Sequence, residues 1–127
     1  MEFRFLTLED VLELHDMQLE SYGGATGIRE QSLLESALMT PQASFGGELV
    51  HNGVFELAAA YAFHIAENQP FVDGNKRTAM ASALVFLDWN HIEISDPNEE
   101  LYDAMIGLAK KTLDKAGLAK LFQKLSH

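Results

Sequence analysis

The sequence Glu67-Asn-Gln-Pro-Phe-Val-Asp-Gly-Asn-Lys-Arg-Thr78 lies between two long apolar segments and holds the densest group of functional polar side chains in the chain. Its first part, Gln69-Pro-Phe, ends one apolar segment, and Asp73-Gly-Asn is a turn sequence that leads into the next. The pattern predicts two long helices joined by a sharp turn. Backbone N–H groups at the start of the second helix would then meet Lys76 and Arg77 at one point, which is how proteins bind phosphate.

The segments on either side of this turn predict the two central helices. Val54 to Ala66 is apolar almost all round, which is typical of a helix buried by its neighbours, and its alanines allow those neighbours to approach closely. Asn75 to Trp89 has an apolar band along one face. We expect these two helices to pack antiparallel.

Shorter helices are expected on both sides of this pair. Thr7-Leu-Glu-Asp10 has the form of a capping box and starts a helix that Gly23-Gly24 ends. A second helix is expected from Arg29 to Pro41. The dipeptide Asp96-Pro97 starts another, with the aspartate as cap and the proline at the first helical position, and the last helix runs from about Asp114 to Leu125.

The remaining segments are expected to be irregular. Gln42 to Asn52 contains Gly46-Gly47 and predicts a loop, with a turn of helix around Ala43 to Phe45; it is either a flap beside the site or a plain connector. His91 to Ser95 predicts a short extended piece, too brief to carry a sheet. Residues 1–127 therefore predict one compact all-α domain, a bundle of six or seven helices.

Several charged and histidine side chains have a simple structural interpretation. His15 falls on the apolar face of the first helix, where a histidine packed at the edge of the core is favoured over a ligand. His64 and Glu67 are three residues apart but have no third partner at a suitable spacing, which argues against a zinc site. The lysines near the C-terminus are expected to form a solvated helix face: Lys110, Lys111, Lys115, Lys120 and Lys124.

Composition limits the classes of function. The formal net charge of the 127 residues is −10, and Arg4 and Arg29 are the cations that precede Lys76. Because nucleic-acid binding depends on neutralising phosphates, direct DNA binding is not expected, and adjacent cations in so acidic a chain indicate a local anion. The sequence has no cysteine and no apolar run of membrane-spanning length. Its first residues lack the pattern of a signal peptide, so we expect none and expect a cytoplasmic protein.

Lys76 and Arg77 are unusual at the start of a helix. The helix dipole disfavours cations there by about 0.3–1 kcal/mol each, so their presence indicates a bound anion. An anion on the backbone N–H groups of Gly74, Asn75 and Lys76 would make both cations complementary to it. Arg77 would bind phosphate through paired hydrogen bonds from its planar guanidinium. Asp73 is a natural N-cap and, beside nucleotide phosphates, an equal candidate for holding Mg²⁺.

Residues 69–78, Gln-Pro-Phe-Val-Asp-Gly-Asn-Lys-Arg-Thr, do not fit a Walker P-loop but resemble the signature of the Fic/Doc proteins, His-Pro-Phe-x-[Asp/Glu]-Gly-Asn-x-Arg. The Asn-Lys-Arg form is typical of the Doc (death on curing) branch. The likeness is specific to the family and extends over nearly the whole chain. It includes Leu14-His15-Asp16, Tyr22-Gly-Gly24, Gly27-Ile-Arg29 and Leu33-Leu-Glu-Ser-Ala-Leu38.

The resemblance implies a Fic-fold helical bundle with the motif between two central helices. Family members transfer part of a nucleotide to a protein hydroxyl, and the Doc branch transfers the γ-phosphate of ATP to a threonine of translation elongation factor Tu, which stops translation. Doc proteins are toxins of toxin–antitoxin pairs, and the disordered part of a Phd-like antitoxin folds onto them. Carried to this sequence, Asp73 would help to hold Mg²⁺, and Gly74 and Asn75 would form an anion hole. Lys76 and Arg77 would bind the phosphates of ATP.

Gln69 is where this sequence departs from the family. The family has a histidine here that takes the proton from the attacking hydroxyl, a role worth about 10²–10⁴ in rate. Glutamine cannot do this at physiological pH, although its amide can still donate a hydrogen bond from nearly the same place. His64 is an alternative base, but it lies five residues upstream and on a different helix face.

Three functions are compatible with these residues. The first is a Doc-type kinase toxin whose transfer activity is impaired by Gln69, whether that residue is natural or engineered. The second is a natural non-catalytic module that binds a nucleotide, an antitoxin or a translation factor. The third is an AMP transferase, which is disfavoured because Lys76 stands where AMP-transferring members usually have glycine. The sequence leaves the oligomeric state open.

Overall fold

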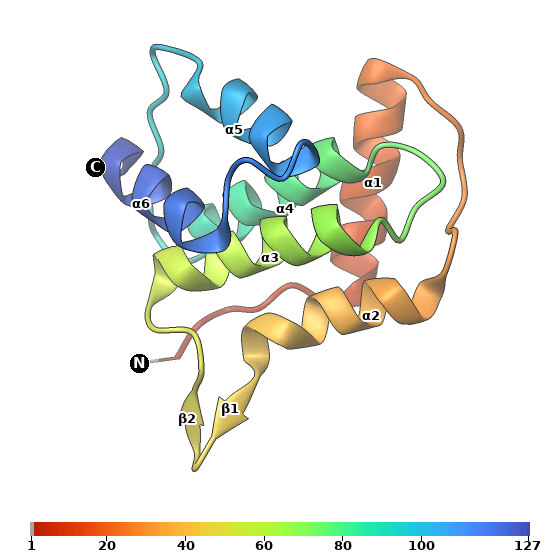
Figure 1. Ribbon diagram of the computed structural model, residues 1–127. Helices are drawn as coiled ribbons and strands as arrows, with labels where there is room; N and C mark the ends of the chain where they lie inside the picture. Colours follow the sequence, from red (N-terminus) through yellow and green to blue (C-terminus); the bar gives the residue numbers. More distant parts are fainter. Residues whose placement is uncertain (1) are drawn as a thin grey trace.

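Two central helices form the middle of the computed structural model, which describes residues 2–127 (Figure 1). α3, Val54–Asn68, and α4, Asn75–Trp89, run antiparallel and are joined by the motif turn. Small side chains at a helix contact let the two backbones approach. The fully buried alanines of the pair are Ala58, Ala59, Ala60, Ala62, Ala79 and Ala83. The predicted antiparallel pair is confirmed.

Four further helices cover this pair (Figure 1). α1, Leu8–Tyr22, packs on α4, while α2, Gln31–Met39, and the 3₁₀ turn η1, Thr40–Gln42, pack on α3. α5, Glu100–Ala109, packs on both central helices, and α6, Lys115–Leu125, packs on α3. Over residues 2–127 the fold is all-α apart from one short hairpin, as predicted. None of these helices is long and apolar enough to cross a membrane.

The hairpin consists of β1, Ser44–Phe45, and β2, Glu48–Leu49, in which the first residue of each strand faces the last residue of the other. The helical turn expected around Ala43 to Phe45 is wrong. Gly46-Gly47 takes φ values of +60° and +84°, the left-handed conformation that makes a tight hairpin turn, so the flanking residues pair as strands. The hairpin lies at the N-terminal end of α3, whereas the motif follows the C-terminal end of that helix, and no hairpin residue lines the cavity at the motif.

The start of α5 also differs from the prediction. The N-cap residue is Glu99 rather than the predicted Asp96. The Asp96 carboxylate still accepts from the first turn, its Oδ1 from the Glu100 N–H at 2.8 Å and its Oδ2 from the Leu101 N–H at 2.9 Å. Pro97, however, lies in the turn before the helix rather than at its first position. The carboxylate therefore reaches over a longer turn than a standard N-cap does.

The core extends from the N-terminal segment to the motif turn. Tyr61 and Phe86 pack with ring centroids 5.2 Å apart, and the Tyr61 hydroxyl accepts the Leu6 N–H at 3.0 Å. At the other end Phe71, in the motif turn, is only 1% exposed. The turn that carries the predicted site is thus fixed from inside by an aromatic side chain.

Candidate functional site

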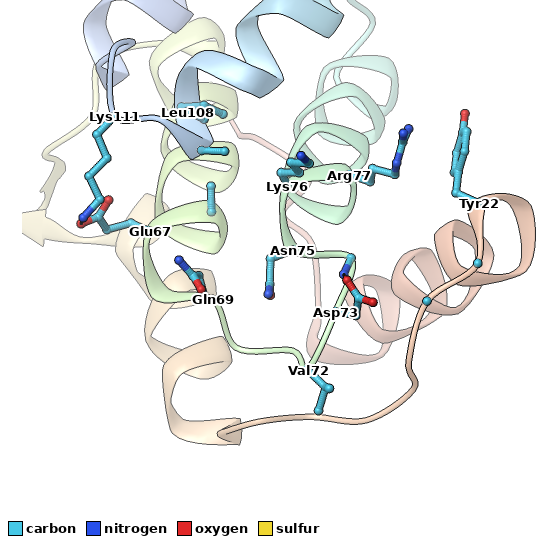
Figure 2. Close-up of a pocket in the computed structure, with 15 residues that line it drawn as sticks. Tyr22, Glu67, Gln69, Val72, Asp73, Asn75, Lys76, Arg77, Leu108 and Lys111 are labelled. Carbon is cyan, nitrogen blue, oxygen red and sulfur yellow. Dashed lines mark hydrogen bonds and ion pairs between the residues drawn. The ribbon is translucent and has the colours of Figure 1, made fainter.

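The predicted site residues line one cavity at the turn between α3 and α4 (Figure 2). Its volume is about 560 Å³, and the end of α1 bounds it on one side and the end of α5 on the other. All six residues contribute to its wall: Gln69, Asp73, Gly74, Asn75, Lys76 and Arg77. Three cations and two carboxylates line it, so this cavity is locally positive in a chain of net charge −10.

Asp73 is not the N-cap of α4, contrary to the prediction. The N-cap is Gly74, which has a left-handed φ of +79°. Asp73 Oδ1 accepts the Gly74 N–H at 2.9 Å, and Oδ2 accepts the Ala25 N–H at 3.2 Å, so the carboxylate fastens the turn to the loop after α1. Both oxygens keep free lone pairs on an exposed side chain. That arrangement suits Mg²⁺ held by one carboxylate together with phosphate oxygens.

Backbone donors are available in the first turn of α4. The N–H groups of Asn75, Lys76 and Arg77 have no intrahelical acceptor, and within residues 2–127 no side chain caps the helix. The Gly74 N–H, expected in the anion hole, is taken by Asp73 instead. The free backbone donors of this turn are therefore shifted one residue along from the predicted set.

The Asn75 side chain closes the motif turn. Its Oδ1 accepts the Phe71 N–H at 2.9 Å, and its Nδ2 donates to the Phe71 carbonyl at 3.0 Å. The two hydrogen bonds use the amide as a paired donor and acceptor. Asn75 thus shapes the turn through its side chain, and only its backbone N–H is left for an anion.

His15 supports the same turn from α1. Its ring stacks on Phe71, with centroids 3.7 Å apart and planes 7° apart, and its Nε2 lies 2.8 Å from the Asp73 carbonyl. Because a carbonyl only accepts, Nε2 carries the proton. The prediction of a histidine packed at the core edge is confirmed, since the side chain is 4% exposed.

Arg29 holds the end of α3 and was not predicted as a site residue. Its Nε donates to the Gln69 carbonyl and its Nη2 to the Asn68 carbonyl, both at 2.8 Å, and its own N–H donates to the Pro70 carbonyl at 2.7 Å. These carbonyls have no intrahelical donor, and a cation at a helix C-terminus is favoured by the dipole. Since Arg29 is extended along the motif, α2 begins at Gln31 rather than at the predicted position.

Gln69 ends α3 in a left-handed conformation, with φ +46° and ψ +58°. Its side chain lies in the cavity between Glu67 and Asn75 (Figure 2), and within residues 2–127 its amide has no hydrogen-bond partner. His64, the alternative base, does not line this cavity. Its Nε2 lies 2.9 Å from Lys115 Nζ, on the side of α3 that faces α6.

Lys115, His51 and His64 form a cluster away from the motif. Lys115 Nζ lies 2.9 Å from Nε2 of each imidazole. Burial, followed by the positive charge of Lys115, lowers the pKa of His64 to about 4, and burial likewise lowers the pKa of His51 and that of Lys115. The prediction of a solvated lysine face is wrong for Lys115, because its ammonium donates to the imidazoles of His51 and His64.

The two ends of the motif cavity carry cations with different partners. On the α1 side, the Arg77 guanidinium lies 3.9 Å from the centroid of the Tyr22 ring. On the α5 side, Lys111 Nζ lies 3.7 Å from Glu67 Oε1, and the two side chains are 73% and 44% exposed. Figure 2 shows these pairs on opposite sides of the cavity.

Lys111 is not a plain solvated residue either. It follows the C-cap of α5 with φ +60°, in the left-handed position where glycine is usual. That conformation costs a lysine about 1–3 kcal/mol, whereas an exposed ion pair contributes about 0–1 kcal/mol. The contact with Glu67 therefore does not account for a lysine at this position.

A family model described as "Fic/DOC family" matches residues 5–87, which include α1 to α3, the motif and most of α4. This chain belongs to the Fic/Doc family. It is 32% identical over 122 residues to the protein kinase Doc of Escherichia phage P1, covering 96% of this chain and 95% of that protein. It is 36% identical over 91 residues to the toxin Doc of Mycolicibacterium smegmatis (strain ATCC 700084 / mc(2)155), covering 72% and 68%.

Within this Fic/Doc chain, the family match separates two parts of the cavity wall. The motif turn and the end of α1 lie inside the matched residues 5–87. Leu108, Ala109 and Lys111, which form the opposite wall, lie outside them. The family match therefore covers the motif side of the cavity and does not cover the opposite wall.

Proposed function

We propose that this chain is a Doc-type toxin of a toxin–antitoxin pair whose site binds ATP with Mg²⁺. Its reaction is transfer of the γ-phosphate to a threonine hydroxyl of translation elongation factor Tu in the cytoplasm, and Gln69 impairs that transfer. The names of two relatives, a protein kinase and a toxin, support this proposal. The observation that carries it is that the six predicted site residues of the motif line one cavity.

Phosphate binding follows from the start of α4. The N–H groups of Asn75 and Lys76 and the side chains of Lys76 and Arg77 all belong to the first helical turn at the cavity. A phosphate there would accept hydrogen bonds from the backbone and from the planar guanidinium. Tyr22 supports Arg77 by contact with its guanidinium and so limits the orientations of that side chain.

Asp73 would hold Mg²⁺ together with the phosphate oxygens. No group of three or more histidine, aspartate or glutamate side chains over residues 2–127 is placed to hold a metal ion. A single carboxylate that shares Mg²⁺ with a nucleotide fits this arrangement. When bound, Mg²⁺ would neutralise charge on the transferring phosphate.

The transfer step has one proton to place. The hydroxyl oxygen of the target bonds to the γ-phosphorus while the bond from that phosphorus to the β–γ bridging oxygen breaks, which leaves ADP and a phosphorylated target. The hydroxyl proton must go to a base. Gln69 occupies the family's base position, and no histidine among residues 2–127 lines the cavity. Binding is therefore retained while the rate of transfer is reduced.

A non-catalytic binding module is the second candidate, and Gln69 favours it. Such a protein would bind ATP, elongation factor Tu or a Phd-like antitoxin without modifying any of them. The two candidates share the same cavity and differ in whether a histidine at position 69 restores chemistry. That difference makes them separable by one substitution.

The test compares the chain, Gln69→His and the control Gln69→Asn with elongation factor Tu and either γ-labelled or α-labelled ATP. The proposal predicts γ-label on the target with Gln69→His and little or none with the other two. Transfer of α-label would make the protein an AMP transferase. No transfer by Gln69→His, with ATP binding intact, would favour the binding module.

A further inference from the structure

A second cavity adjoins the motif cavity at its α5 side. Its volume is about 530 Å³, and Glu67, Leu108 and Lys111 line both cavities. The wall between the two is therefore made of these three side chains, and two of them form the exposed ion pair at 3.7 Å. The remaining lining residues are Phe63, Thr112, Leu113 and Asp114.

The chemistry of the two cavities differs. The motif cavity holds Lys76, Arg77 and the free backbone donors, which suit phosphates. The second cavity combines the Phe63 ring and two leucines with four polar or charged side chains, those of Glu67, Lys111, Thr112 and Asp114. An aromatic ring beside hydrogen-bonding side chains suits a flat heterocyclic base that carries polar groups at its edge.

The Phe63 ring is held in place rather than loosely exposed. The His64 ring meets it edge-on with centroids 5.2 Å apart, and Lys115 Nζ lies 5.9 Å from its centroid. Phe63 is half-buried and belongs to α3, one turn before Glu67. A rigid aromatic wall lies next to the ion pair that separates the cavities.

Lys111 stands where a ligand spanning both cavities would cross. Its backbone position is unfavourable for lysine, and Glu67 is an exposed partner that it can leave. In a cavity whose other cations belong to α4, Lys111 supplies positive charge from the opposite wall. A chain of phosphates between the two walls would be contacted from both sides.

We propose that the ATP of the proposed function lies across both cavities, with its phosphates at the start of α4, its adenosine in the second cavity against Phe63, and Lys111 as a third phosphate-binding cation. This rests on the proposed function and assigns the site's nucleoside end. On binding, Lys111 exchanges Glu67 for the phosphate chain. Glu67 is then free to accept from the ribose hydroxyls.

The experiment measures the dissociation constants of Mg-ATP and of inorganic tripolyphosphate by calorimetry. Thr112→Trp fills the second cavity from its exposed rim, and Asn98→Trp, at an exposed turn outside both cavities, is the matched control. We expect Thr112→Trp to weaken ATP at least tenfold and to leave tripolyphosphate within twofold, whereas Asn98→Trp changes neither. Equal ATP affinity of Thr112→Trp and the control contradicts the nucleoside assignment. That result is expected if the second cavity receives part of the protein substrate instead.

Lys111 is tested with Lys111→Gly, which removes the cation and also relieves the left-handed backbone. We expect weaker binding of both ligands together with a higher melting temperature, a combination that general damage to the fold would not produce. Unchanged affinity for both ligands contradicts the role of Lys111. If the unmodified chain binds neither ATP nor tripolyphosphate, the proposed function fails with it. If tripolyphosphate binds, but Thr112→Trp and Lys111→Gly leave the dissociation constants unchanged, only the assignment of the nucleoside and of Lys111 is wrong.

Discussion

The His15 ring lies flat on the Phe71 ring, 3.7 Å between centroids, and so connects α1 to the turn that carries the motif. The same imidazole reaches the Asp73 carbonyl at 2.8 Å. One side chain thus packs on the hydrophobic part of the motif and hydrogen-bonds to its polar part. The order of the site depends on a residue that contributes nothing to its wall.

His15→Ala is expected to lower the free energy of unfolding by about 2–3 kcal/mol, because it removes both buried packing and a hydrogen bond. His15→Phe keeps an aromatic ring but loses the Nε2–H donor. It should retain most of the stability while weakening Mg-ATP binding, since the Asp73 carbonyl loses its hydrogen-bond donor. Urea unfolding and calorimetry check the two effects separately. Equal stability of His15→Ala and the parent chain would refute this role.

Arg29→Met is expected to destabilise the protein by about 1–3 kcal/mol, because the Asn68 and Gln69 carbonyls lose a charged donor. Methionine keeps much of the apolar stem, so the loss reports the guanidinium. The matched control is Arg4→Met, which removes a cation that lies on Trp89 at 3.9 Å, far from the motif in the chain. Only Arg29→Met should also weaken ATP binding; if both variants do so equally, the motif is not specifically dependent on Arg29.

Gly24→Ala tests the contact between the Asp73 carboxylate and the loop after α1. A Cβ at Gly24 would lie 2.9 Å from Asp73 Oδ2, and the backbone there has φ +123°. We expect a loss of stability and weaker Mg²⁺-dependent ATP binding, because the carboxylate must move. Gly23→Ala is the comparison for backbone strain alone, because among residues 2–127 the added Cβ meets no atom within 4 Å other than those of Gly23 and its two chain neighbours. Equal effects of the two substitutions would show that strain, not the contact with Asp73, decides the result.

The cluster of Lys115 with His51 and His64 predicts a pH dependence of stability. The groups that act on His64 are Lys115, His51 and Glu67, and its pKa falls from 6.5 to about 4 on folding. The unfolded chain therefore binds more protons between these values, so the stabilisation is present above pH 6.5 and lost as the pH falls towards 4. After discounting for partial exposure, the effect is about 1–2 kcal/mol.

His64→Gln is the variant that checks this assignment. It should flatten the dependence of unfolding free energy on pH between about 4 and 6.5, as measured by urea denaturation across that range. His91→Gln, an exposed histidine in a turn, is the matched control and should leave the slope unchanged. A slope that His64→Gln does not alter would place the titration elsewhere.

The helical framework was predictable because its signals are local. The apolar run before Gln69, the capping box at Thr7 and the turn at Asp73-Gly74 each follow from side chains close in sequence. The motif's share of the cavity wall was also predictable, since those residues lie close together in sequence, whereas the walls from α1 and α5 were not. What failed were assignments that depend on distant contacts or on a choice between two local forms.

Arg29 shows why part of the site was missed. Its partners, the carbonyls of Asn68 and Gln69, are 39 and 40 residues away along the chain, and no local pattern reports such a contact. A lone cation in an acidic stretch was the signal available. Lys115 was misassigned for a similar reason, because its histidine partners come from α3 and from the segment before it.

The role of Gln69 is tested most directly by the single-turnover rate of γ-phosphate transfer to elongation factor Tu, measured together with the dissociation constant of Mg-ATP. Gln69→His should raise the rate by about 10²–10⁴ and leave the dissociation constant within about twofold, because the substitution adds a base without altering the phosphate donors. An equal rate for both proteins, or an unmodified chain that does not bind Mg-ATP, would contradict a site that holds its nucleotide but lacks the proton acceptor.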